Sequence, residues 1–461
     1  MQRAGLTLWS ALLRVRQART ELLLFGFFFV VFALTAGRSG LCFDVFTSNY
    51  ASWRLATAHT PYLDGVSIPE LDHNSISWVW ISEGANGHSV ITRAPAAVIA
   101  GLPAYLLTRP DSMTVLPAAI TAAAMTALSV LLVHRAVRTA AEPWQALAAA
   151  AVFGLTTPVW SVAANGIWPQ TITVLGIAVA AWGASSERWW WVGAGGVLLL
   201  WARPHAAVIV AVVGLSLAWR ERRIGIAVRS GVPGLLSLPL LCAWTHWVYG
   251  SWSPFPLFGS GAFAQVQQSL FDLPNQLAMW VAPDRGLFVY TPVLLLLLPT
   301  LVRVRRQLPA WSTALLLGGL AYTVLQAALI GYSGGYPIYG YRYGLEFLAC
   351  ATPAFAFAAC RVAGLARRAL APVLALQFTV IAFGAVIDSM WLDDTAGWTN
   401  NAFTHTMYAH APGAPLLALI VGCVALWVIR SWVRSRAGAA PAPEPPLPTT
   451  TGVEVLLAER R

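Results

Sequence analysis

The stretch "ELLLFGFFFVVFALTAG", residues 21–37, decides the fold, because it is almost wholly apolar over nearly the length that a bilayer demands. A hydrocarbon core about 30 Å thick needs roughly 20 apolar residues in a helix. Arg14, Arg16 and Arg19 precede the run, as on the cytoplasmic flank of a membrane helix. Its end, "LTAGRSG", is a poor small-residue cleavage site, so the sequence predicts an anchored first helix rather than a cleaved signal peptide.

The composition of the whole chain points the same way. Of 461 residues, 57% are hydrophobic and only 10% are charged, and the mean hydropathy is +0.64. A soluble protein carries about 25% charged residues, so we predict an all-α, polytopic protein of the cell membrane. The formal net charge of +10 does not indicate a nucleic-acid partner. The arginines stand in short clusters between apolar segments, without zinc-finger spacing or an RNA-binding signature.

Further apolar runs bring the predicted bundle to about twelve spans. They are residues 113–133, 144–162, 168–184, 189–202, 205–219, 231–249, 287–302, 311–331, 344–360, 370–388 and 413–430.

The arginine clusters between these runs predict the topology. All of them fall on the cytoplasmic side, together with both termini, if "APAAVIAGLPAYLL" (residues 94–107) does not span the membrane. That stretch is short and holds Pro95 and Pro103, so we expect a juxtamembrane helix along the external surface. The clusters comprise Arg135 with Arg138, and the arginines within residues 220–223, 303–306, 361–368 and 430–436.

The chain therefore divides into a transmembrane domain, residues 1–430, and a Pro/Ala-rich tail, residues 431–461, which is expected to be disordered in the cytoplasm. Most Asp, His, Trp and Tyr residues fall in four predicted external segments. These are residues 38–108, 250–286, 331–344 and 389–412.

Asp44, just beyond the first helix, is the first candidate for chemistry. Partial desolvation at that depth would raise the basicity of its carboxylate and suit it to accept a proton from a hydroxyl. A helix N-cap, or a loop Asp paired with a nearby arginine, is the structural alternative. Asp44, Asp64 and Asp72 could also hold a divalent cation, although no ligand spacing is diagnostic.

Three arginines are the second set of candidates. Arg203 stands between two short apolar stretches, so we expect a partner, either an anionic lipid headgroup or a buried carboxylate such as Asp388. Arg285 and Arg342 enter from neighbouring external segments and would make a fork for a phosphate. Arg342 lies in "GYSGGYPIYGYRYG" (residues 331–344), whose tyrosines could bind a sugar or form an interfacial aromatic belt. A belt does not explain its glycines, which indicate close backbone approach or a mobile loop.

The order of motifs resembles the bacterial GT-C-type integral membrane glycosyltransferases, in the protein-mannosyltransferase-like superfamily. The resemblance runs to about residue 390 and rests on Asp44 after the first helix and on several short motifs. They are "NGHSVITRAPAAVIAGLPAYLL", "NGIWPQTITVLGIAVAAW", "ARP", "YGSWSPF", "DRGLFVYTP" and "YGYRYGLEFLACATP". It implies a polyprenyl-phosphate sugar donor, inverting transfer on the external face, an acidic residue at Asp44 that acts as base or metal ligand, and an arginine at Arg342 that contacts the donor phosphate.

We therefore expect a glycosyltransferase in which Asp44 activates the acceptor hydroxyl and Arg342, Arg285 and Arg203 bind the donor phosphate. The expected substrate-binding residues are His88, Arg93, Trp168, Gln170, Tyr341 and Tyr343. A transporter or flippase of a lipid-linked saccharide, or an inactive relative, is the alternative. Transporters usually show inverted repeats and polar groups accessible from both sides, whereas the polar residues here lie on one predicted side.

Overall fold

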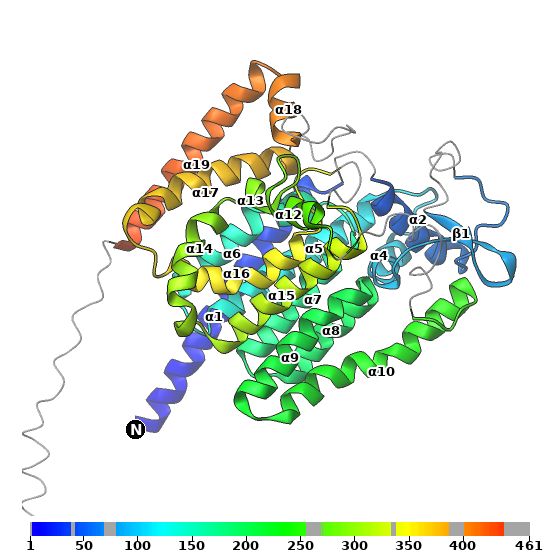
Figure 1. Cartoon of the computed structure of the whole chain (residues 1–461), viewed down its shortest axis with the longest axis horizontal. Helices are drawn as coiled ribbons and strands as arrows, with labels where there is room; N and C mark the ends of the chain where they lie inside the picture. The colour runs from blue at the N-terminus through cyan, green and yellow to red at the C-terminus, as the bar shows by residue number, and fades with distance from the viewer. Residues whose placement is uncertain are drawn as a thin grey trace, which may run out of the picture.

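The computed structural model describes residues 2–37, 42–68, 80–254, 269, 271–332, 338–386 and 401–437, and these are almost entirely α-helical (Figure 1). The predicted tail beyond residue 437 lies outside the described residues, and the last helix continues past the predicted boundary at residue 430.

The described elements follow one another along the chain. In order they are α1 (Gln2–Thr35), α2 (Phe43–Ala58), β1 (Ile81–Glu83), η2 (Ala85–Gly87), β2 (Ser89–Ile91), α4 (Pro95–Thr108), α5 (Leu116–Val137), α6 (Pro143–Leu155), η3 (Val159–Ala163), α7 (Pro169–Ser185), α8 (Trp189–Ala202), η4 (Pro204–Ala206), α9 (Ala207–Glu221), α10 (Ile224–Tyr249), α12 (Leu273–Val281), α13 (Leu287–Tyr290), α14 (Val293–Val304), η5 (Arg305–Gln307), α15 (Ala310–Leu329), α16 (Leu345–Ala359), α17 (Gly364–Val386), α18 (Ala402–Ala409) and α19 (Gly413–Ala437).

The helices confirm the character of a membrane protein, while the number of spans stays a prediction. Within the described residues, six helices are long and apolar enough to cross a bilayer: Val15–Thr35 of α1, α5, α10, α15, α17 and Gly413–Ser435 of α19. Other apolar helices are shorter; the 14 residues of α8 rise only about 21 Å, less than the thickness of a hydrocarbon core.

Two of the predicted spans are interrupted by proline. The run at 144–162 becomes α6 and the π-helical turn η3, because Pro158 disfavours helical backbone at the residue before it. The run at 287–302 divides into α13 and α14 at Thr291 and Pro292 for the same reason. These interruptions lie near the candidate site described below, since the Thr291 hydroxyl contacts the Tyr341 hydroxyl.

The centre of the bundle is α7, most of whose residues are buried against α5, α8 and α16. Small residues let α7 and α8 approach closely. A Cβ on Gly195 of α8 would lie only 2.4 Å from the carbonyl oxygen of Gly176 on α7. Close backbone packing at glycines is the usual way in which membrane helices associate without a hydrophobic driving force.

The predicted juxtamembrane helix is confirmed as a helix, α4. Its buried side, which includes Ala97, Gly101 and Tyr105, packs on α2 and α5. The Ser52 hydroxyl of α2 donates a hydrogen bond to the carbonyl of Val98 at 2.8 Å. In Figure 1 this helix lies with α2 and the β1–β2 hairpin at one side of the bundle, away from the N-terminus of α1.

Helix directions separate the arginines at the end of α5 from α2, α4 and the β1–β2 hairpin (Figure 1). Helix α5 begins beside Gly37, which contacts Val115 and Ala119, and ends at Arg135. Helix α7 begins at Pro169. Near its other end, the centre of the Trp182 ring lies 5.9 Å from the guanidinium carbon of Arg135. The two sets of residues therefore lie at opposite ends of the same helices.

We predict that Gly195→Ala destabilises the protein, because the added methyl group would force α7 and α8 apart. Overpacking of this kind costs about 1–3 kcal/mol, and the thermal unfolding midpoint in detergent should fall. Gly234→Ala on α10 is the matched control, since nothing lies within 4 Å of its Cβ position. Equal midpoints for the two variants would contradict the packing argument.

The predicted topology can be tested with single cysteines in a chain whose five native cysteines have been replaced. On intact cells an impermeant thiol reagent should label Thr108→Cys, at the end of α4. It should label Arg306→Cys only after permeabilisation, because the arginine ends are expected to be cytoplasmic. The reverse pattern would invert the assignment.

Candidate functional site

Asp44 lies in the first turn of α2, where a carboxylate interacts favourably with the helix dipole. Its Oδ1 accepts hydrogen bonds from Nη2 of Arg93 at 2.8 Å and from Nε1 of Trp80 at 3.1 Å. Its Oδ2 accepts a hydrogen bond from Nη1 of Arg342. The carboxylate therefore links three segments that are distant in the sequence.

The charge of Asp44 is set by these two arginines. Burial raises the pKa of the carboxyl, but Coulombic attraction by Arg93 and Arg342 and their hydrogen bonds outweigh it, so the pKa lies well below its usual range. The prediction that desolvation makes Asp44 more basic is therefore wrong for this arrangement. The structural alternative, an Asp paired with arginine, is what the structure contains.

The β1–β2 hairpin positions Arg93. The two strands pair antiparallel, and the turn between them places Asn86 at φ 56° and Gly87 at φ 80°, values that Asn-Gly turns favour. Arg93 follows β2, donates from Nε to the Thr47 hydroxyl at 2.6 Å, and donates from its backbone N–H to the Tyr249 hydroxyl at 3.1 Å. The "NGHS" motif thus forms the hairpin turn.

Arg342 reaches Asp44 from the segment before α16. Its guanidinium carbon lies 5.4 Å from the centre of the Trp168 ring and 4.9 Å from that of Tyr343. Its Nη2 donates to the Tyr343 hydroxyl at 3.1 Å, whereas its buried Nε has no hydrogen-bond partner within the described residues. Aromatic faces hold the cation without neutralising its charge.

Arg203 stands on another side of this group, at the end of α8. Its guanidinium carbon lies 4.8 Å from the Tyr343 ring centre. Its Nη1 donates to Tyr322 and Gln326, both at 2.8 Å, and lies 3.8 Å from Oε1 of Glu346. The expected partner of Arg203 is therefore a buried carboxylate, Glu346; Asp388 lies outside the described residues.

We call Arg93, Arg203, Arg342, Asp44 and Glu346 the arginine cluster. Three guanidinium groups face two carboxylates, which leaves one net positive charge if both carboxylates are ionised. Arginine forks in a partly desolvated place suit planar oxyanions such as phosphate. The cluster has the charge to bind an anion.

Two buried side-chain amides, those of Gln170 and Asn49, have no hydrogen-bond partner among the described residues. The side chains of Gln170 and Asn49 are 0% and 1% exposed, and neither polar atom of either has a hydrogen bond in the part of the chain that the structure describes. An unsatisfied buried amide costs about 1–3 kcal/mol. Gln170 follows Trp168 on α7, and Asn49 follows Asp44 on α2. Amides so placed can bind hydroxyl groups of a ligand.

The remaining predicted residues contact other groups. The Tyr341 hydroxyl contacts that of Thr291 at 2.6 Å. Tyr290 lies edge-on to Tyr341, with ring centres 6.5 Å apart, and buried Arg285 interacts electrostatically with Tyr290. The sequence suggested that Arg285 and Arg342 together would form a fork for a phosphate. In the structure, the arginine that shares Asp44 with Arg342 is Arg93.

His88 of the β1–β2 hairpin pairs with Asp64, which lies in the segment between α2 and the hairpin. His88 Nδ1 lies 2.5 Å from Asp64 Oδ2, and the two side chains are 40% and 50% exposed. The His88 ring also stacks on Tyr62, with centres 4.3 Å apart. The hydrogen bond from the Ser89 backbone N–H, together with the one from His88, lowers the pKa of Asp64.

The described residues do not fit the divalent cation considered from the sequence. Both oxygens of Asp44 already accept hydrogen bonds from arginines, and Asp64 pairs with His88. Asp72 lies outside the described residues. Within those residues, no three His, Cys, Asp or Glu side chains gather as metal ligands do.

Compared with models of known protein families and with curated proteins, the sequence matches none. The resemblance drawn from short motifs therefore stands on those motifs, and the functional argument rests on the arginine cluster and the groups around it.

Sequence reasoning missed Glu346, Asn49 and Trp80. Glu346 had a usable signal, since an acidic residue inside a long apolar run normally has a buried partner or a function. Asn49 and Trp80 had none, because only the folded chain brings Trp80 to Asp44 and buries Asn49 without a partner.

We predict that Asp44→Asn destabilises the protein at neutral pH, because it leaves Arg93 and Arg342 without their shared carboxylate. Breaking such a pair costs about 3 kcal/mol. Because the pKa of Asp44 is lowered in the folded state, the carboxylate contributes to stability above about pH 4, the ordinary pKa of an Asp side chain. This contribution to stability is lost as the pH falls further. Thermal unfolding of both proteins should thus differ at pH 7 and converge in acid. A constant difference across that range would contradict the assignment.

Proposed function

We propose that the protein is a membrane glycosyltransferase that moves a sugar from a polyprenyl-phosphate donor to an acceptor hydroxyl on the external face of the membrane. The observation that carries the proposal is the bond between Arg342 and Asp44 beside the Trp168 ring. It joins a phosphate-binding cation, a carboxylate and an aromatic wall in one place, which are the groups that such a transfer requires.

The reaction assigns a role to each group. The acceptor oxygen attacks the anomeric carbon, the bond from that carbon to the phosphate oxygen breaks, and the bonding electrons leave with polyprenyl phosphate. Asp44 takes the proton of the acceptor hydroxyl. Arg342 and Arg203 stabilise the negative charge on the departing phosphate. Gln170 and Asn49, whose buried amides have no hydrogen-bond partner among the described residues, are assigned to sugar hydroxyls.

Donor binding would also activate Asp44. Arg93 and Arg342 keep the pKa of Asp44 low, so the carboxylate is a poor base while both arginines pair with it. A phosphate that draws Arg342 away removes one of the two cations and raises the pKa toward the range in which Asp44 accepts a proton. The base thus becomes effective only when the donor is bound. Arg93, held by Thr47, stays with Asp44 and orients it.

The test uses the full chain in detergent with a panel of polyprenyl-phosphate sugars, chosen by which lipid-linked sugar accumulates in cells without the protein. Arg342→Lys keeps the charge but loses the planar fork, so donor affinity and turnover should both fall. Arg342→Ala should reduce turnover by roughly 100- to 1,000-fold. Asp44→Asn should retain donor binding and lose transfer. Release of polyprenyl phosphate and direct donor binding are measured separately.

Arg109→Lys is the matched control, because Arg109 is exposed at the end of α4 and its side chain hydrogen-bonds only the Leu106 carbonyl among the described residues. Each variant is compared at equal folded fraction from its thermal unfolding curve. If the protein moves the donor across the bilayer without releasing polyprenyl phosphate, the protein is a flippase and not a glycosyltransferase. Wild-type turnover in Arg342→Ala would remove the cluster from the mechanism.

A further inference from the structure

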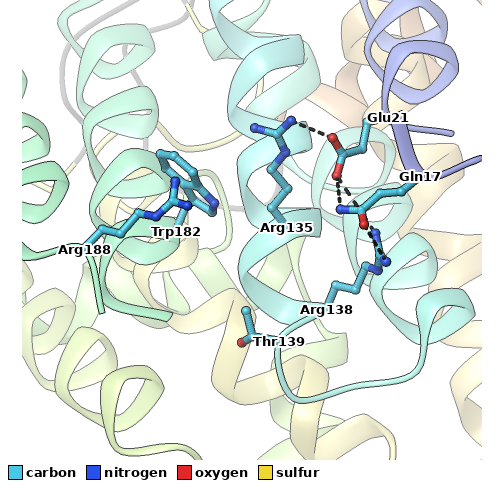
Figure 2. A pocket seen from close by; sticks show the side chains of 7 residues that line it. All are labelled: Gln17, Glu21, Arg135, Arg138, Thr139, Trp182 and Arg188. Carbon is cyan, nitrogen blue, oxygen red and sulfur yellow. Dashed lines mark hydrogen bonds and ion pairs between the residues drawn. The ribbon is translucent and has the colours of Figure 1, made fainter. Parts of the chain in front are cut away.

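At the end of the bundle opposite Asp44, arginines surround an open cavity between α1, α5, α7 and α8 (Figure 2). Its volume is about 450 Å³, within the range of small-ligand pockets. Arg135 and Arg138 come from the end of α5, Arg188 from the residue before α8, and Trp182 from α7. The cavity is thus a meeting point of four helices, and it lies away from the proposed transfer site at the other end of α7 and α8.

One carboxylate faces three guanidinium groups in this cavity. Arg135 Nη2 donates to Glu21 Oε2 at 2.6 Å. Arg138 Nη1 lies 4.0 Å from the same carboxylate, and its Nη2 donates to the neutral Gln17 amide at 3.1 Å. Arg188 forms no ion pair within the described residues. The lining therefore carries two net positive charges.

Trp182 holds two of these cations without neutralising them. The guanidinium carbons of Arg188 and Arg135 lie 5.2 and 5.9 Å from the centre of its ring. Figure 2 shows the Arg188 side chain lying across the indole while Arg135 turns toward Glu21. Contact with an aromatic face fixes the Arg188 fork and leaves its N–H groups able to donate to an anion.

With α1 and α5 crossing a bilayer as expected from their apolar spans, the cavity would lie near one headgroup layer. Glu21 belongs to the first part of the apolar span Val15–Thr35, and Arg135 lies in the last turn of the span α5. Headgroups occupy the layer just outside the hydrocarbon core. Basic pockets between the ends of membrane helices bind anionic headgroups in that layer.

We propose that this cavity binds a phosphate group, with Arg188 and Arg138 as the donors and Trp182 as the wall. A phospholipid headgroup and soluble phosphate offer the same chemistry to the guanidinium groups. The 14 residues from Trp168 to Trp182 along α7 correspond to roughly 20 Å. The cavity is therefore separate from the arginine cluster, and the proposal does not depend on the proposed transfer reaction.

The experiment compares the full chain in detergent with the variants Arg188→Gln and Arg220→Gln. Both residues are exposed and both variants lose one charge, but Arg220 lies on α9 and does not line the cavity. Native mass spectrometry measures the affinity for phosphatidylglycerol. Thermal unfolding with and without inorganic phosphate tests the soluble source and confirms that each variant is folded.

The wild type and Arg220→Gln should bind the phosphate probe alike, and Arg188→Gln about tenfold more weakly, which corresponds to about 1.4 kcal/mol. A loss confined to phosphatidylglycerol identifies the lipid headgroup as the source. A loss of stabilisation by inorganic phosphate identifies a soluble ligand. Equal affinities of all three proteins for both probes would overturn the proposal, because general attraction to the arginine end would then account for binding.

Discussion

The carboxylate of Asp44, shared between Arg93 and Arg342, is the interaction on which the end of the bundle that carries α2, α4 and the β1–β2 hairpin depends. It joins the start of α2 to the segment after β2 and to the segment before α16. None of these segments is a long membrane helix, so bilayer packing alone does not fix their positions. Charge pairing in a partly desolvated place fixes them instead, at the cost of a carboxylate that is a weak base while both arginines are present.

The two ends of the bundle use arginine differently. At the Asp44 end, each guanidinium of the arginine cluster has a carboxylate within 4 Å, and the aromatic rings lie between the cations. At the other end Glu21 is the only carboxylate lining the cavity, and Arg188 rests on Trp182 alone among the described residues. The first arrangement suits reversible exchange of one anion for another, and the second suits retention of an anion.

The sequence predicted the helices better than the contacts between them. The run at 189–202 coincides with α8, and 344–360 differs from α16 by one residue at each end, because apolar runs are local information. Pro158 and Pro292 were visible, yet their effect depends on how neighbouring helices accommodate a break. Asp44 and Arg342 were both chosen as candidates, but their pairing joins residues 298 positions apart. Residue type indicates what a side chain can do; which partner it meets, and hence the sign of the Asp44 pKa shift, comes from the fold.

Tyr343 couples the position of Arg342 to the start of α16. Its ring lies against both Arg203 and Arg342, and α16 begins two residues later. A ligand that displaces Arg342 would therefore displace the first turn of α16, where Glu346 accepts a hydrogen bond from the Thr173 hydroxyl of α7. The Tyr343 ring separates two like charges, and a displacement of this tyrosine would be passed to α16. Binding of an anion at the arginine cluster would in this way shift α16 against α7 in the core of the bundle.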